Sequence, residues 1–260
     1  MKRILSIAVI TLLTMSLSAN ETEDPFAEAE EKVYRTSQGT QLYAWLTHSD
    51  GHRQAPLVVL LHMREKDHES YGPFLTAMRN HVESDTTQTL VMPYTLSFDM
   101  RGHGKSTRYG RAWLAAEDMR KPHWMDVPAE LAEMTDTIIA DSSYNIDPER
   151  IYLVGASIGA QAAMLMTGHM KQTARVAMLS PTRNYFGLEI PETLYSYDGR
   201  MLIIIDKRDH RRFQQCTEMF QEHGRDNLEL MTYSERLRGT DLIDGQPRAM
   251  ADLIEWLFKD

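Results

Sequence analysis

The most restrictive feature of this sequence is a strand-like run, a glycine–serine–glycine turn and an apolar helix-like run in direct succession. Residues 150–154 read as a buried β-strand, GASIG follows at residues 155–159, and the residues after it are rich in alanine, methionine and leucine. Glycines on both sides of Ser157 let the chain turn sharply and hold the serine hydroxyl above the end of the strand. This context predicts a nucleophile elbow, the turn that presents a reactive serine at the start of a helix.

Strand-like and helix-like runs alternate along most of the 260 residues. Such alternation predicts a mostly parallel central sheet with helices on both faces, and we expect a single α/β domain over residues 33–260. The strand-like runs lie at residues 57–62, 96–100, 150–155, 175–180, 200–206 and 228–233.

The N-terminus has the layout of a bacterial-type secretory signal peptide. Lys2 and Arg3 precede an apolar run over residues 4–17, and small and polar residues follow it. We expect residues 1–19 to be cleaved, which gives a periplasmic or secreted protein without a stable membrane span; a retained anchor is the alternative. Residues 20–32 are rich in acidic residues and read as a solvated N-terminal tether.

Charge and composition exclude several classes of partner and cofactor. The formal net charge is −9, and removal of Lys2 and Arg3 makes it −11, so an acidic surface argues against nucleic acid. Cys216 is the single cysteine and cannot form an internal disulfide; its spacing from nearby phenylalanines indicates a buried apolar side chain. Paired metal-ligand spacings and phosphate-binding glycine loops are not found, so neither a metal nor a cofactor is expected.

A second motif, DMRGHGKS at residues 99–106, joins the elbow in a wider pattern. Together they resemble the α/β-hydrolase fold family and are most similar to its dienelactone-hydrolase-like and esterase-like branch. The resemblance covers nearly the whole mature chain, from YRTSQGTQLYAWL at residues 34–46 to LIEWLF at residues 253–258. It implies an α/β-hydrolase fold and activity on a small-molecule ester or another acyl substrate.

The resemblance also implies a role for individual residues. Ser157 matches the nucleophile, and the backbone N–H groups of Met63 and Ile158 match the donors of the oxyanion hole. Asp209 matches the acid of the triad, with Asp206 as a weaker candidate at the end of the same strand-like run.

The triad histidine is missing from its expected position. In this branch it should directly precede the run GTDLI, residues 239–243, where this chain has Arg238, and no histidine follows His223. Arginine cannot act as the general base, because with a pKa of about 13 its neutral fraction at pH 7 is on the order of one in a million. An arginine there could instead form an ion pair with Asp209.

Three functional interpretations remain open. In the first, an ester hydrolase takes a substitute base from His123 or His210, while His62 and His103 are structural. In the second, the protein is a pseudohydrolase that binds a ligand or partner without turnover, since loss of a triad histidine costs on the order of a million-fold in kcat. In the third, Ser157 is acylated slowly and then stays acylated.

Overall fold

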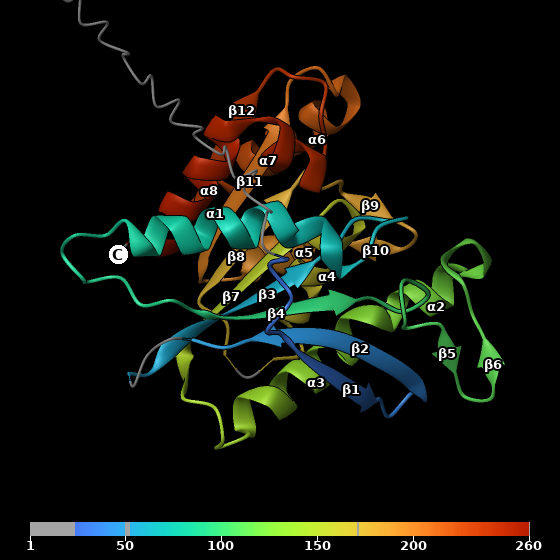
Figure 1. The fold of residues 1–260 in the computed structure, drawn as a ribbon. Coiled ribbons are helices and arrows are strands. Elements are labelled where there is room, and N and C mark those ends of the chain that lie inside the picture. Colours follow the sequence, from blue (N-terminus) through green and yellow to red (C-terminus); the bar gives the residue numbers. More distant parts are fainter. Residues whose placement is uncertain (1–23, 50–52, 171, 260) are drawn as a thin grey trace, which may run out of the picture.

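A computed structural model of the chain describes residues 24–49, 53–170 and 172–259. Its centre is a ten-stranded sheet in the order β12-β11-β8-β7-β3-β4-β2-β5-β6, with β1 paired to β2 (Figure 1). The run from β12 to β4 is parallel, whereas β1, β2, β5 and β6 pair in antiparallel fashion. The strands of this sheet are β1 (Glu30–Arg35), β2 (Thr40–Thr47), β3 (Ala55–Leu61), β4 (Tyr94–Asp99), β5 (Arg108–Tyr109), β6 (Ala112–Trp113), β7 (Ile146–Ala156), β8 (Arg175–Leu179), β11 (Arg200–Asp206) and β12 (Leu228–Tyr233).

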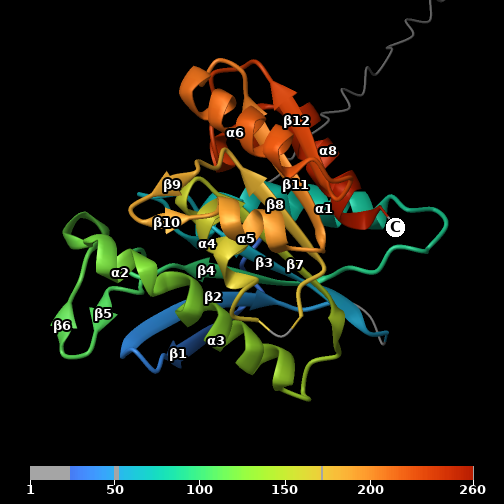
Figure 2. The ribbon, with the colours of Figure 1, turned by 180° about the vertical axis from the view of Figure 1, so that it is seen from behind.

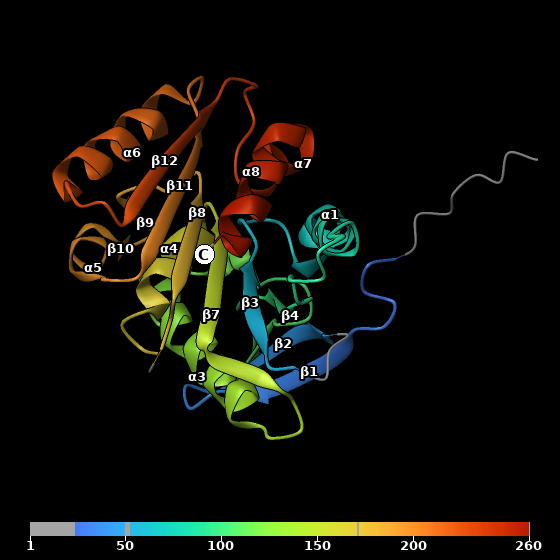
Figure 3. The ribbon, with the colours of Figure 1, turned by 90° about the vertical axis from the view of Figure 1, so that its left-hand side faces the viewer.

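Helices cover both faces of the sheet (Figure 3). On one face lie α1 (Gly72–Glu83), α7 (Thr240–Gly245) and α8 (Pro247–Phe258). On the other lie α3 (Val127–Ala140), α4 (Ile158–Met166), α5 (Pro191–Ser196) and α6 (His210–His223). Shorter elements are η1 (His68–Tyr71), η2 (Ala116–Asp118), α2 (Lys121–Met125) and the hairpin β9 (Asn184–Tyr185) with β10 (Leu188–Glu189).

The continuous apolar run in β3 reflects burial on both faces of the sheet. Leu57, Val59 and Leu61 pack into the core beneath α3 and α4, whereas Val58 and Leu60 pack into the core beneath α1 and α8. All five side chains are at most 1 % exposed, and burial of each contributes roughly 1.5–3 kcal/mol. A parallel strand between two helical layers therefore has no polar face.

The parallel strands bring their carboxyl ends to one edge of the sheet. The residues that follow β3, the serine that follows β7 and the acidic residues at the end of β11 meet there, although they are far apart in sequence. At this edge, β5, β6 and α2 project as a small lobe, and the β9–β10 hairpin lies above it in the rear view (Figure 2).

The architecture confirms the expected sheet, because every predicted strand coincides with β3, β4, β7, β8, β11 or β12. The proposed signal peptide lies outside the described residues. Glu30–Lys32, the last residues of the segment expected to be a tether, belong instead to β1 and pair with β2. In the part of the chain that the structure describes, no helix is long and apolar enough to cross a membrane.

Candidate active site

The turn at Ser157 has the strained geometry of a nucleophile elbow. Ser157 adopts φ 51° and ψ −114°, a backbone conformation that residues other than glycine rarely take. Its N–H donates to the Leu179 carbonyl at 2.8 Å. Both flanking glycines are required by close approach: a Cβ on Gly155 would lie 2.1 Å from the Gly159 carbonyl oxygen, and one on Gly159 would lie 2.2 Å from that of Leu61. The glycines therefore let α4 begin directly against the ends of β3 and β7.

Two backbone amides at or near the serine turn, those of Ile158 and Met63, have no acceptor among the described contacts. Ile158 is the first residue of α4, so its N–H has no acceptor within the helix. Within the described residues, neither this N–H nor that of Met63 donates to a protein atom. The Ser157 side chain is partly exposed and has no hydrogen-bond partner among the described contacts. A hydroxyl and two free donors are the groups that acyl transfer requires.

Asp209 does not pair with the arginine at the histidine position. It caps α6, accepting a hydrogen bond from the Arg212 N–H at 3.4 Å, and its carboxylate also lies 2.7 Å from the Arg212 guanidinium. Arg238 is exposed and forms no ion pair or hydrogen bond with any described residue. The cation that pairs with Asp209 is therefore Arg212, in the first turn of the helix that Asp209 caps.

Asp206, the weaker candidate, anchors a loop. Its buried carboxylate accepts hydrogen bonds from the N–H groups of Arg208 at 2.7 Å, Glu235 at 2.5 Å and Leu237 at 3.2 Å. Burial alone would raise the pKa of Asp206, but these amides favour the charged form and hold the pKa below its ordinary value. Asp206 thus ties the chain before Arg238 to the end of β11.

The loop that carries Arg238 packs directly against the elbow. Gly239 has φ 55°, and its N–H donates to Ser180 Oγ at 3.0 Å. A Cβ on Gly239 would lie 2.8 Å from Met63 Sδ and 3.4 Å from the Ala156 Cβ. The residue after the position at which a triad histidine is expected therefore contacts Met63 and Ala156, and an arginine occupies that position.

The candidate substitute bases have other surroundings. His123 Nδ1 accepts a hydrogen bond from the Arg120 N–H at 3.1 Å, and its ring lies 6.1 Å from that of Tyr109. His210 is exposed at the first position of α6, beside Asp209. Among the described residues, no histidine forms a hydrogen bond with the nucleophile candidate.

His62 and His103 have structural contacts. His62 is fully buried, donates from Nδ1 to the Met63 carbonyl at 2.8 Å and accepts at Nε2 from the Met100 N–H at 3.0 Å. Burial, together with the nearby His103, lowers the pKa of His62 to about 3, so the ring is neutral near pH 7. His103 Nδ1 donates to the Arg101 carbonyl at 3.0 Å.

A pair between the buried Asp99, at the end of β4, and the partly buried His68 was not anticipated from the sequence. Asp99 accepts from the N–H of His68 at 3.0 Å, from His68 Nδ1 at 2.8 Å and from the Lys105 N–H at 2.7 Å. The His68 ring stacks on Trp45, with ring centres 3.4 Å apart. A Cβ on Gly104 would lie 2.0 Å from the Asp99 carboxylate, which explains a glycine in DMRGHGKS. The only sequence signal for this pair is an acidic residue near the end of an otherwise apolar strand.

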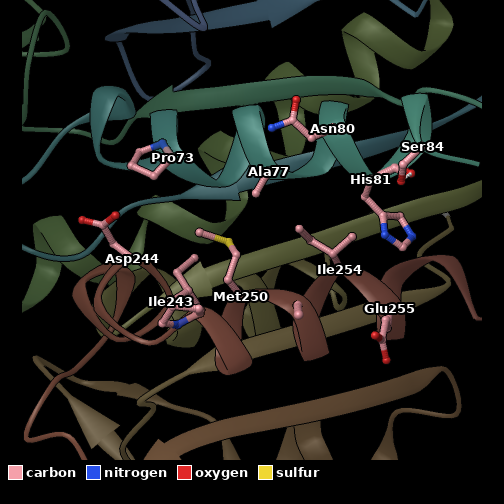
Figure 4. Close-up of a pocket in the computed structure, with 12 residues that line it drawn as sticks. Pro73, Ala77, Asn80, His81, Ser84, Ile243, Asp244, Met250, Ile254 and Glu255 are labelled. Carbon is pink, nitrogen blue, oxygen red and sulfur yellow. Dashed lines mark hydrogen bonds between the residues drawn. The ribbon is translucent and has the colours of Figure 1, made fainter. Parts of the chain in front are cut away.

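Two further features lie away from the elbow. Cys216 is fully buried on the α6 side, and burial raises the pKa of its thiol to about 12, which confirms an apolar filling role. A groove of about 530 Å³ runs between α1 and α8 and is lined partly by Ala77, Ile243, Met250 and Ile254 (Figure 4). It lies on one face of the sheet, and Ser157 is not among its lining residues.

No family model and no curated protein matches this sequence. Solved structures do match its three-dimensional arrangement. An esterase from Pyrococcus furiosus aligns with a TM-score of 0.66 and 16 % identity, covering 88 % of this chain and 90 % of the other. A dienelactone hydrolase from Anabaena variabilis gives 0.60 and 16 %, covering 88 % and 95 %, and an alpha-beta serine hydrolase homologue from Coxiella burnetii gives 0.56 and 18 % over the same shares. The chain has the α/β-hydrolase fold.

Proposed function

We propose that this protein is a serine hydrolase that acts on carboxylic esters through Ser157. The observation that carries the proposal is the strained elbow at φ 51°, which presents a hydroxyl without a hydrogen-bond partner among the described contacts next to the free N–H of Ile158. The free N–H of Met63 belongs to the segment after β3, which packs against the same turn at Gly159. Backbone strain of this kind persists only where the surrounding structure enforces it, and it concentrates at functional sites. The esterases and hydrolases that share the fold support the same chemistry.

The proposed reaction follows from these groups. Ser157 Oγ attacks the carbonyl carbon of the ester while its proton leaves, and the carbonyl oxygen becomes negative between the amides of Met63 and Ile158. Collapse of this intermediate breaks the bond to the alcohol, which takes up a proton, and leaves an acyl group on the serine. Water then attacks the acyl carbon and releases a carboxylic acid and the free serine. Each step moves a proton, and Arg238 cannot accept one.

A catalytically impaired pseudohydrolase is the alternative, and specific contacts favour it. Asp209 is paired with Arg212, and no described histidine forms a hydrogen bond with Ser157. A site without a base retains the donors that bind an acyl oxygen but loses most of its rate. On this interpretation, the pocket binds a ligand or partner without turnover.

Hydrolysis of p-nitrophenyl acetate and butyrate by the mature protein tests the proposal. We expect slow turnover that Ser157→Ala abolishes. The Arg238→His variant should be faster if the arginine blocks an otherwise intact site. Loss of activity in His210→Gln or His123→Gln would identify a substitute base. A wild-type rate equal to that of Ser157→Ala would refute the hydrolase and favour the pseudohydrolase.

The slow-acylation interpretation has its own readout. If water is not activated, Ser157 should gain a stable acetyl mass after mixing with p-nitrophenyl acetate, and intact-protein mass spectrometry would detect it. Ser157→Ala should gain none. Rapid loss of the acetyl mass on removal of substrate would show that deacylation proceeds without a triad histidine.

We also propose that the mature protein is periplasmic or secreted after cleavage near residue 19. The charged start and apolar run over residues 2–17 support this location. N-terminal sequencing of the protein recovered from a bacterial periplasm tests it: a start at residue 20 supports cleavage, and a start at Met1 contradicts it.

A further inference from the structure

We propose that the lobe formed by residues 105–126 docks on the surface of an anionic phospholipid bilayer. This docking lobe contains β5, β6, η2 and α2 and projects from the carboxyl edge of the sheet, the edge at which Ser157 lies (Figures 1 and 2). The inference does not depend on whether the serine turns over, because the exposed apolar side chains and the charges that carry it include neither Ser157 nor the candidate bases His123 and His210.

The docking lobe exposes large apolar side chains. Trp113 is 69 % exposed and Met125 is 54 % exposed, the two highest values among the large hydrophobic residues that the structure describes. Phe186, in the neighbouring β9–β10 turn, is 37 % exposed and stacks on the buried Trp124, with ring centres 5.6 Å apart. Phe186 is thus attached to the docking lobe through Trp124. Exposed apolar groups with a polar rim mark interaction sites.

The docking lobe carries a net positive charge on an otherwise acidic protein. The net charge of the lobe is +2, whereas that of the whole chain is −9. Its five cations are Lys105, Arg108, Arg111, Arg120 and Lys121, and its three carboxylates are Glu117, Asp118 and Asp126. The Arg108 guanidinium lies 4.3 Å from the centre of the Trp113 ring. Among the described residues, Lys105 pairs with Glu31 and Asp126 with Arg101, but the other four cations form no ion pair.

This combination fits a bilayer surface better than a protein partner. Tryptophan favours the headgroup level of membranes, and arginine and lysine are attracted to anionic lipids. Stable protein interfaces are built around a buried apolar core, whereas the lobe offers two strongly exposed large apolar side chains, Trp113 and Met125. Anionic lipids repel the acidic remainder of the molecule. Contact through the lobe would therefore turn toward the bilayer the sheet edge at which the parallel strands end and Ser157 lies.

Tryptophan fluorescence with vesicles tests the proposal directly. Three of the four tryptophans are buried: Trp45 is 8 % exposed, Trp124 0 % and Trp256 2 %. A change of emission on membrane contact therefore reports Trp113. We expect a blue shift and cosedimentation with vesicles that contain phosphatidylglycerol, both weakened by salt, and neither with vesicles of phosphatidylcholine alone.

Variants separate docking from general stickiness. Arg111→Gln and Arg120→Gln should each weaken binding about fivefold, and Trp113→Ala should remove the blue shift. Val33→Ser and Phe220→Ser remove exposed apolar groups on other elements and should bind like wild type. Equal binding of Trp113→Ala and wild type, absence of binding at low salt, or Trp113-dependent dimerisation in place of vesicle binding would overturn the proposal. Hydrolysis of soluble p-nitrophenyl acetate needs no bilayer, so either result leaves the hydrolase proposal intact.

Discussion

Replacement of Ser157 by glycine should stabilise the protein while it removes the nucleophile. The backbone at φ 51° and ψ −114° is strained for any residue with a Cβ, whereas glycine adopts it freely. The serine hydroxyl has no hydrogen-bond partner among the described contacts, so little is lost with it. The Ser157 backbone is thus strained although its hydroxyl is not needed for stability. Functional sites show this combination.

The size of the effect follows from two opposing contributions. Strain in such a conformation costs about 1–3 kcal/mol, and glycine removes it. An additional glycine also gives the unfolded chain greater conformational freedom, and this entropy lowers the gain in stability by about 0.4–1 kcal/mol. We therefore expect Ser157→Gly to raise the free energy of unfolding by about 1 kcal/mol, or the Tm by about 2–4 °C. Ser157→Ala retains the Cβ and should stay within about 0.5 kcal/mol of wild type.

Urea unfolding followed by circular dichroism would measure these differences. Ala251→Gly is the matched control, because it adds a glycine to the exposed side of α8, where glycine lowers stability by about 0.5–1 kcal/mol. A Ser157→Gly protein that is less stable than Ser157→Ala would refute the argument from strain and remove the main support for a functional elbow.

Three further results are expected around the loop that carries Arg238. Gly239→Ala should lower the free energy of unfolding by about 2 kcal/mol in a denaturant titration, since its Cβ would meet Met63 Sδ at 2.8 Å and its φ is 55°. Asp206→Asn should cost about 2–3 kcal/mol by the same measurement and speed hydrogen exchange at the Glu235 and Leu237 amides, because charge-assisted hydrogen bonds are lost. The contribution of Asp206 depends on pH: its folded pKa is lowered, so its stabilisation is fully present above the ordinary value of about 4 and is lost as pH falls through the lower folded pKa. Wild type and Asp206→Asn should thus differ in stability at pH 7 and converge toward pH 2, and an equal gap at both would contradict this assignment.

Short-range sequence patterns predicted the parts of the molecule that depend on neighbouring residues. The apolar run in β3 indicated a strand buried on both faces, and the structure confirms it. The elbow was predictable because the sharp turn at Ser157 needs glycine on both sides, although the atoms that exclude a Cβ on Gly159 belong to the distant Leu61. Side-chain contacts between distant residues gave no comparable signal, as Asp99 and His68 illustrate.

By itself, the sequence determined the α/β class, the serine on a glycine-flanked turn and the presence of Arg238 where a histidine was expected. Only the tertiary structure decided which charges meet: Asp209 pairs with Arg212, and Asp206 holds the backbone before Arg238. The reason is physical, because a turn conformation is limited by local sterics, whereas the partner of a carboxylate depends on which donor the packed elements bring within hydrogen-bonding distance.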